Sequence, residues 1–124
     1  MLSRLIAVTL AACLATGCFS MKLERERRKA LKRIDVEACE AGGGEIRQVC
    51  MFGIPACVQI FSDGGKPCRD SSECEGLCSV RYWEEGNAPK PGQPWVGECE
   101  PDNDRCGCSF LVENGLAGQA FCSD

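Results

Sequence analysis

Cysteine is the residue that most constrains how this chain can fold. The chain has 12 cysteines among 124 residues and no histidine. A cysteine content of roughly a tenth is typical of exported domains that are held together by disulfides. The absence of histidine excludes Ser-His-Asp and Cys-His nucleophile systems, histidine general bases and histidine metal ligands. The composition therefore predicts an exported, disulfide-rich scaffold.

The N-terminal segment has the pattern of an export signal. Arg4 precedes an uncharged apolar run over residues 5–15, which suits a signal peptide and is too short to span a bilayer as a helix. The run LATGC over residues 14–18 resembles the lipobox of bacterial lipoproteins. In that family the chain is cleaved before the cysteine, whose sulfur carries a diacylglycerol. The resemblance implies a signal peptide over residues 1–17 and lipidation at Cys18.

Cys13 is a second candidate for the lipidated residue. The run LAAC over residues 10–13 matches the lipobox pattern better than ATGC over residues 15–18. Cleavage at Cys13, however, would leave an apolar run near the lower limit for a signal peptide. Lipidation at Cys18 also leaves ten cysteines, an even number that can all pair. We therefore prefer Cys18, with Cys13 and an ordinary secretory signal as alternatives.

Residues 18–37 are predicted to form a charged helical tether behind the lipidated cysteine. Residues 22–37 carry seven basic and four acidic side chains and no Gly or Pro, which favours a helix. Apolar residues recur in this segment at helical spacing, and Arg27 interrupts them. One interpretation is a basic stalk beside an anionic membrane surface. The alternative is a solvated spacer, or a helix that packs its apolar stripe on the rest of the protein.

Residues 38–124 are predicted to form a disulfide-bonded, acidic head domain. They carry 6 basic and 14 acidic side chains, a net charge of −8. A domain of this size buries a modest core and needs cross-links. We predict that all ten of its cysteines form disulfides, in a pairing that the sequence does not specify; they are Cys39, Cys50, Cys57, Cys68, Cys74, Cys78, Cys99, Cys106, Cys108 and Cys122.

Turn signals and alternating polarity predict a small antiparallel β structure in this head. Asn114-Gly115 is a strong hairpin turn signal, and Asp70, Ser71 or Ser72 could cap a short helical turn. The expected fold is a small disulfide-rich, mainly β domain of antiparallel hairpins with long loops plus an N-terminal helix, α+β overall. Strands are expected over residues 45–52, 56–61, 77–83, 95–100, 108–113 and 116–122, and loops over residues 62–76 and 85–94.

Three segments of the head resemble a group of small cysteine-rich exported bacterial proteins. They are CEAGG over residues 39–43, DGGKPCRDSSECEGLC over residues 63–78 and FCSD over residues 121–124. Members of the group share a DxGKxC segment that is followed by SxxCxGxC. The resemblance implies the compartment and the disulfide-rich fold. It implies no catalytic or binding residue, because the group has no assigned activity that we know of.

Sulfur chemistry is the first alternative to a purely structural role for the cysteines. The chain has no Cys-x-x-Cys motif, and Cys106-Gly107-Cys108 is its closest cysteine pair. Nothing around that pair predicts a lowered thiol pKa, so two adjacent structural disulfides are expected there. A zinc site would need four thiolates, whereas export favours disulfides. The four cysteines considered for zinc are Cys74, Cys78, Cys106 and Cys108.

Acidic side chains offer two further alternatives. Asp102, Asp104, Gly107 and Glu113 match four positions of a calcium-binding loop, but a cysteine stands at one of the oxygen-ligand positions. Carboxylate pairs can also hydrolyse glycosides, although acidic clusters more often form solvated surface; the pairs considered are Glu84 with Glu85 and Glu98 with Glu100. We predict no metal, no cofactor and no enzyme activity.

The segment that joins aromatic residues to prolines is the candidate interaction site. Tyr82, Trp83 and Trp95 flank a proline-rich loop, beside Glu84 and Glu85. Aromatic side chains dominate interface energetics, and a proline-stiffened loop loses less freedom on binding. The alternative is that the tryptophans pack in the core, which we prefer for Trp95 and leave open for Trp83.

Together these features predict a lipid-anchored protein of the bacterial cell envelope that faces the periplasm. Its head is expected to be a non-enzymatic protein-interaction module of an inhibitor or immunity type. The acidic head suits a basic periplasmic partner, and a net charge of −4 for the chain argues against nucleic acid. Phe19 follows Cys18 where lipoproteins retained in the inner membrane have Asp, so that resemblance favours the outer membrane. The alternatives are a structural envelope spacer or assembly factor, and a cysteine-based metal-binding protein.

Intact-mass spectrometry of the membrane-purified protein tests this prediction. We expect the mass of residues 18–124 plus an acyl anchor, and a gain of ten hydrogens when reduction opens the bridges formed by ten cysteines. A mass without lipid would contradict the anchor. Full reaction with a maleimide before any reductant is added would contradict the disulfides.

Overall fold

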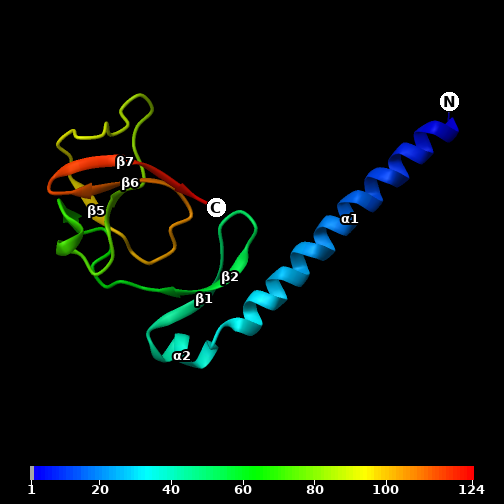
Figure 1. Ribbon diagram of the computed structural model, residues 1–124, viewed down its shortest axis with the longest axis horizontal. Helices are drawn as coiled ribbons and strands as arrows, with labels where there is room; N and C mark the ends of the chain where they lie inside the picture. The colour runs from blue at the N-terminus through cyan, green and yellow to red at the C-terminus, as the bar shows by residue number, and fades with distance from the viewer. Residues whose placement is uncertain (1) are drawn as a thin grey trace.

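The chain forms a long helix that leads into a disulfide-bonded head with two antiparallel sheets (Figure 1). The computed structural model describes the backbone of residues 2–124 and the side chains of residues 19–124. Most of the predicted signal peptide over residues 1–17, with Cys13, and also Cys18 lie outside the residues whose side chains are described. The expected α+β, disulfide-rich fold class is confirmed.

Helix α1 (Leu2–Arg33) meets the head along one face. Leu23, Arg27 and Ala30 of the helix are partly buried, as is Ile34 just after its last residue, whereas the residues between them are exposed. Their spacing of three or four residues places them on one side of a helix. This face packs against the second strand of the head. The C-terminal part of the tether is therefore a helix packed on the head, which was one of the alternatives considered for it.

Arg27 binds this face of α1 to a turn of the head through hydrogen bonds. Its Nε and Nη2 atoms both donate hydrogen bonds to the backbone oxygen of Phe52, at 2.9 and 2.7 Å. The next residue, Gly53, has a φ of 58°, and a Cβ atom there would stand 2.9 Å from Arg27 Nη2. The arginine that interrupts the apolar stripe in the sequence is therefore a contact residue in the fold.

The predicted helix over residues 22–37 is wrong at its C-terminal end. Helix α1 ends at Arg33, and a second helix, α2 (Val36–Ala41), begins after Asp35. The side chain of Asp35 accepts a hydrogen bond from the amide of Ala38 at 2.9 Å. An aspartate that satisfies a free amide in this way starts a new helix, so the chain turns toward the head instead of continuing straight.

Strands β1 (Gly44–Val49) and β2 (Ile54–Gln59) form a two-stranded antiparallel sheet. Pairing covers Gly44 opposite Gln59 through Val49 opposite Ile54. The predicted strands, residues 45–52 and 56–61, were placed too far along the chain. The reason is the turn between them, where Cys50 and Gly53 have φ values of 57° and 58°, which a strand cannot accommodate.

The larger sheet has five antiparallel strands in the order β3-β5-β4-β6-β7. The β6–β7 hairpin turns at Asn114 and Gly115, which have φ values of 52° and 76°, as that dipeptide predicts. Four of the five strands overlap predicted ones; β3 lies in a predicted loop and has only two residues. The strands are β3 (Pro67–Cys68), β4 (Cys78–Val80), β5 (Gly97–Cys99), β6 (Gly107–Glu113) and β7 (Leu116–Ser123).

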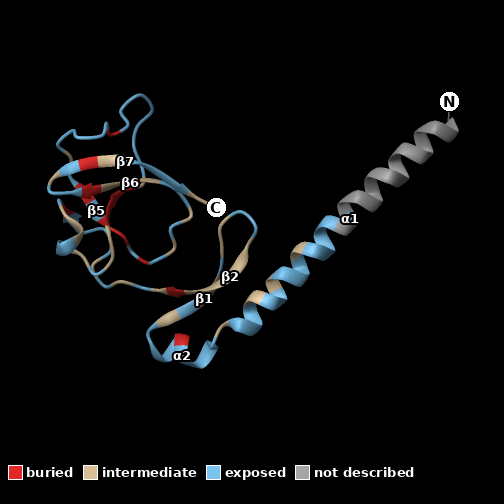
Figure 2. Ribbon diagram, viewed as in Figure 1, coloured by how far each residue is buried: buried red, intermediate tan, exposed pale blue. Residues whose placement is uncertain are grey.

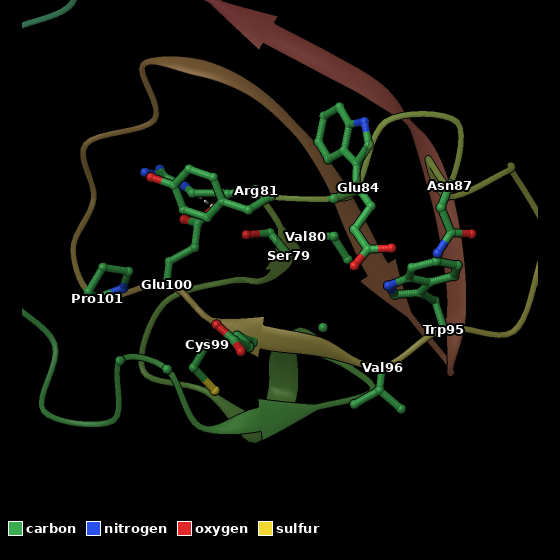
Figure 3. Close-up of a pocket in the computed structure, with 16 residues that line it drawn as sticks. Ser79, Val80, Arg81, Glu84, Asn87, Trp95, Val96, Cys99, Glu100 and Pro101 are labelled. Carbon is green, nitrogen blue, oxygen red and sulfur yellow. Dashed lines mark ion pairs between the residues drawn. The ribbon is translucent and has the colours of Figure 1, made fainter.

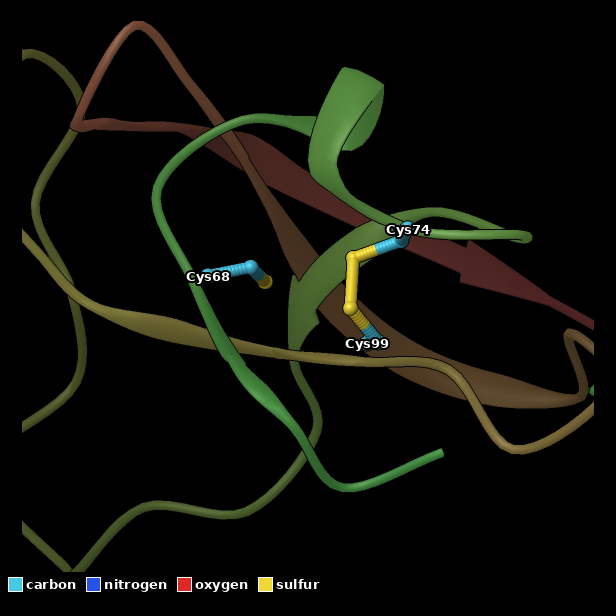
Figure 4. Close-up of side chains that lie close together, drawn as sticks. All are labelled: Cys68, Cys74 and Cys99. Carbon is cyan, nitrogen blue, oxygen red and sulfur yellow. A yellow bond between two sulfur atoms is a disulfide. The ribbon is translucent and has the colours of Figure 1, made fainter. Parts of the chain in front are cut away.

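The core of the head is built around cystine sulfur. Buried residues gather within the five-stranded sheet (Figure 2). The Sγ atoms of Cys68, Cys74 and Cys99 lie within 4.8 Å of one another (Figure 4), so two bridges stack in the centre. The buried cluster consists of Cys68, Cys78, Val80, Cys99, Phe110 and Val112.

All ten cysteines of the head form disulfides, as predicted. One bridge joins α2 to the small sheet, another joins the two sheets, and three lie within the larger sheet and its loops. The bridge between the sheets closes a separation of 56 residues. The pairs are Cys39–Cys57, Cys50–Cys106, Cys68–Cys78, Cys74–Cys99 and Cys108–Cys122.

Asp70 joins two turns of the head. It caps the short 3-10 helix η1 (Ser71–Glu73) by accepting hydrogen bonds from the amide and hydroxyl of Ser72. Its other oxygen accepts one from the amide of Asn114, at 2.8 Å. These donors, the Ser72 hydroxyl first, hold the pKa of Asp70 well below its usual range. Of the three residues that could cap this turn, Asp70 is the one that does so, and it also contacts the hairpin turn.

Replacing Arg27 by alanine is expected to loosen α1 from the head. The change removes both hydrogen bonds to Phe52 and leaves every disulfide intact. We expect amide hydrogen exchange at residues 50–53 to become about fivefold faster, which is what the loss of about 1 kcal/mol of net hydrogen bonding would give. Arg28→Ala is the control, because Arg28 is exposed and carries the same charge. Equal acceleration in both variants would contradict the contact.

Replacing Asp70 by asparagine is expected to lower the melting temperature of the head at neutral pH. Because folding depresses the pKa of Asp70, its stabilising effect is present above the unfolded pKa of about 3.9 and is lost as the pH falls below that value. The difference in melting temperature between the wild type and the variant should therefore become smaller as the pH is lowered. Asp124→Asn, at the exposed C-terminus, is the matched control. A difference in melting temperature that grows as the pH is lowered would show that ionised Asp70 does not stabilise the head.

Candidate functional site

A cavity of about 630 Å³ lies beside strands β4 and β5 of the larger sheet (Figure 3). Its walls come from the chain that leaves β4, residues 81–87, and from residues 95–101, which include β5. Its volume lies within the range of about 300–1,000 Å³ that is usual for ligand pockets. We call this cavity the aromatic pocket and take it as the candidate functional site.

The pairing of β4 with β5 brings the two walls together. Ser79 lies opposite Glu98, and Cys78 lies opposite Cys99. A Cβ atom on Gly97 would approach the backbone oxygen of Ser79 to 2.9 Å, so a residue without a side chain allows the strands this approach. Cys78 and Cys99 each belong to a separate disulfide. The base of the pocket is therefore held by covalent bonds as well as by the sheet.

All the tryptophan and tyrosine residues of the chain line the aromatic pocket. The sequence has 2 Trp and 1 Tyr, and Tyr82, Trp83 and Trp95 all line the cavity. Trp83 meets Phe110 edge to face, with ring centroids 5.0 Å apart and an interplanar angle of 77°. Trp95 packs on the buried cluster. Both tryptophans therefore serve the core and the pocket, which resolves the alternatives that the sequence left open for them.

Exposure leaves part of this aromatic surface free for contact. Tyr82 is 91% exposed and Trp83 is 38% exposed, and Trp95 is partly buried. Packing against the core fixes the rings of Trp83 and Trp95, so these two side chains have little freedom left to lose when a ligand binds. The two indoles thus form an ordered apolar wall, and Tyr82 adds an exposed ring at its edge.

Three carboxylates and one guanidinium share the lining: Glu84, Glu98 and Glu100 against Arg81, a formal net charge of −2. The Glu100 side chain is 3% exposed and lies 3.9 Å from Arg81 Nε. Arg81 Nη2 also donates a hydrogen bond to the backbone oxygen of Asp104. One carboxylate is therefore neutralised within the protein, while Glu84 and Glu98 are exposed.

One of the open carboxylates, Glu84, lies beside the aromatic wall. Figure 3 shows the side chains of Glu84 and Asn87 directed toward the part of the pocket where the Trp95 indole lies, with the Arg81–Glu100 pair at the other end. The pocket therefore has one end with a satisfied ion pair and another where negative charge adjoins an indole.

Four of the five predicted interaction residues lie at this pocket. Tyr82, Trp83, Glu84 and Trp95 line it, whereas Glu85 is exposed and is not among the lining residues. Sequence reasoning missed Arg81 and Asn87, and it considered Glu98 and Glu100 only for catalysis. Their common position follows from the β4–β5 register, for which the sequence offers no signal.

The carboxylates considered for catalysis are also brought together. Glu84 from one pair and both Glu98 and Glu100 from the other line the aromatic pocket. Because Glu100 is paired with Arg81, Glu84 and Glu98 are the two carboxylates that a bound molecule would meet without displacing an ion pair.

The four cysteines considered for zinc lie in four different disulfides, with Cys99, Cys68, Cys50 and Cys122 as their partners. Zinc binds thiolates, so this set offers it no ligands in the oxidised protein. The central cluster of Cys68, Cys74 and Cys99 is likewise oxidised (Figure 4). The Cys106-Gly107-Cys108 pair belongs to two separate bridges, as expected.

The acidic side chains considered for calcium binding form hydrogen bonds with other residues of the protein. Asp102 is 9% exposed, accepts a hydrogen bond from Arg47 Nη2 at 2.7 Å and another from the amide of Asp104 at 2.9 Å. The bond to Asp102 is the main cause of a raised pKa of Arg47. Glu113 accepts a hydrogen bond from the hydroxyl of Ser71 at 2.6 Å. These carboxylates therefore stabilise loops through hydrogen bonds within the protein.

Comparison of the chain with known protein families, with curated proteins and with solved structures finds no match. In the described part of the chain, no helix combines the length and the apolar character that crossing a membrane requires.

Proposed function

We propose that this protein is a lipid-anchored cell-envelope protein whose head binds a basic partner protein and catalyses no reaction. The observation that carries the proposal is the aromatic pocket, where all the Trp and Tyr of the chain meet exposed carboxylates on a disulfide-bonded sheet. Fixed aromatic rings with a charged rim are typical of recognition surfaces.

The charge of the head supports a basic partner. Residues 38–124 have 6 basic and 14 acidic side chains, and the pocket lining has the same sign. Complementary charge accelerates the encounter of two proteins and disfavours wrong partners. A role as an inhibitor or immunity factor for a cationic enzyme or toxin fits this pattern.

The position of the pocket supports a head that presents it to a partner on the side away from the membrane. Helix α1 leaves the head on one side, and β5, which contributes to the pocket, lies on the opposite side (Figure 1). In this proposal the chain is cleaved before Cys18, the lipid is attached to Cys18, and the protein resides in the outer membrane. The basic residues of α1 then lie nearest the anionic lipid surface.

One observation favours a second candidate function. Glu84 and Glu98 are exposed carboxylates in one cavity, and two carboxylates that flank a scissile bond can hydrolyse a glycoside. Turnover of an envelope polysaccharide by the purified, oxidised protein, with loss of that turnover in Glu98→Gln, would support this candidate over recognition.

Site-specific photo-crosslinking in living cells tests the proposed function. A photoreactive residue replaces Tyr82, which is 91% exposed at the pocket, or Met51, which is 73% exposed on the β1–β2 turn and serves as the control. We expect position 82 alone to capture a basic envelope protein. In membranes isolated from these cells, capture should fall between about 0.1 M and about 1 M salt, where the Debye length shrinks from about 10 to about 3 Å.

Two outcomes would contradict the proposal. One is the absence of any adduct at position 82 while the protein is intact and membrane-bound. The other is an equal yield of the same adduct from position 51, which would show that the contact does not depend on the pocket.

A further inference from the structure

We infer that the aromatic pocket binds one arginine side chain, presented by the basic partner. This inference rests on the proposed function and deepens it, because it names the chemical group that the pocket receives. It follows from three features of the pocket: its charge, its aromatic wall and its fixed geometry.

The charge of the lining selects a cation. Three carboxylates face one guanidinium in the cavity, and Arg81 is engaged by Glu100 and by the backbone of Asp104. The carboxylates of Glu84 and Glu98 have no ion-pair partner among the described residues. A neutral or anionic ligand would leave these two carboxylates unpaired or repelled, whereas a cation pairs with them.

The aromatic wall favours a planar cation. A cation over an indole face is attracted by the negative face of the ring system, and a guanidinium also stacks on it. Trp95 lies beside Glu84 in the pocket (Figure 3). An arginine can therefore stack on an indole while its N–H groups donate to a carboxylate, an arrangement that a compact ammonium does not reproduce.

The pocket already contains one example of the same pairing. The protein's own Arg81 reaches a carboxylate of this lining, Glu100, with its Nε atom 3.9 Å from that carboxylate. The end of the pocket around Glu84 and Trp95 has the carboxylate and the ring but no guanidinium of its own among the described residues that line it. The cavity volume of about 630 Å³ accommodates one such side chain with part of its backbone.

Tryptophan fluorescence of the full-length, oxidised protein in detergent tests the inference directly. Both tryptophans of the chain line the pocket, so the whole indole signal reports on it. The probes are two short glycine-flanked peptides with blocked ends, one carrying arginine and the other citrulline, which has nearly the same shape without the charge. We expect saturable quenching by the arginine peptide that weakens with salt, and at least tenfold weaker binding of the citrulline peptide.

Two neighbouring glutamates supply a matched pair of variants. Glu84 lines the pocket and Glu85 does not, and both are exposed. Each change to glutamine removes one negative charge at nearly the same place. We expect Glu84→Gln and Glu98→Gln to weaken the arginine peptide about three- to fivefold each, as for an exposed ion pair, and Glu85→Gln to leave it unchanged. Unaltered near-ultraviolet circular dichroism would show that the variants fold.

Several results would overturn the inference. They are equal binding of the citrulline and arginine peptides, equal weakening by Glu84→Gln and Glu85→Gln, and no fluorescence change at millimolar peptide. If the arginine inference fails while position 82 still captures a basic protein, the interaction function stands with a different contact. If the arginine peptide binds while position 82 captures nothing, the pocket chemistry stands and the proposed function fails.

Discussion

Covalent sulfur cross-links are the constraint on which the rest of this structure depends. Four of the nine buried apolar residues of the head are cysteines in disulfides, namely Cys39, Cys68, Cys78 and Cys99. Each bridge stabilises a small domain by about 2–4 kcal/mol, largely by restricting the unfolded chain. Two neighbouring disulfides therefore occupy the centre of the core, where a larger domain would have aliphatic side chains. The same disulfides stabilise strands as short as β3 and β5.

The same cross-links explain how so small a head can present a formed pocket. Cys78 and Cys99 lie on paired strands at the base of the aromatic pocket, each in its own bridge. Trp83 and Trp95 then pack on the core that these strands carry. Rigid walls lower the conformational entropy that binding removes. In this way the disulfide framework brings aromatic rings and open carboxylates into one pocket.

The junction between α1 and the head depends on polar contacts as well as on apolar packing. Arg27 donates twice to Phe52, and Asp35 starts α2 after α1 ends. Together they direct the chain from the long helix into the head, with β5 on the far side (Figure 1). A uniformly apolar stripe would have allowed the helix to slide or rotate, whereas a two-donor contact to one carbonyl oxygen sets its register.

The sequence by itself determined the features that depend on neighbouring residues. The cysteine content predicted a disulfide-bonded scaffold, Asn114-Gly115 predicted the β6–β7 turn, and Asp70 predicted the capped turn, because composition, turn type and capping are set within a few residues of chain. The aromatic segment likewise indicated the aromatic wall of the pocket, Tyr82, Trp83 and Trp95. Only the tertiary structure decided the features that long-range contacts create: which cysteines pair, where the tether helix breaks, the pairing of β3 with β5, and the presence of Glu98 and Glu100 in the same pocket as Trp95. Residues such as Cys50 and Cys106, 56 positions apart, meet because the whole head folds, and no local pattern encodes that approach.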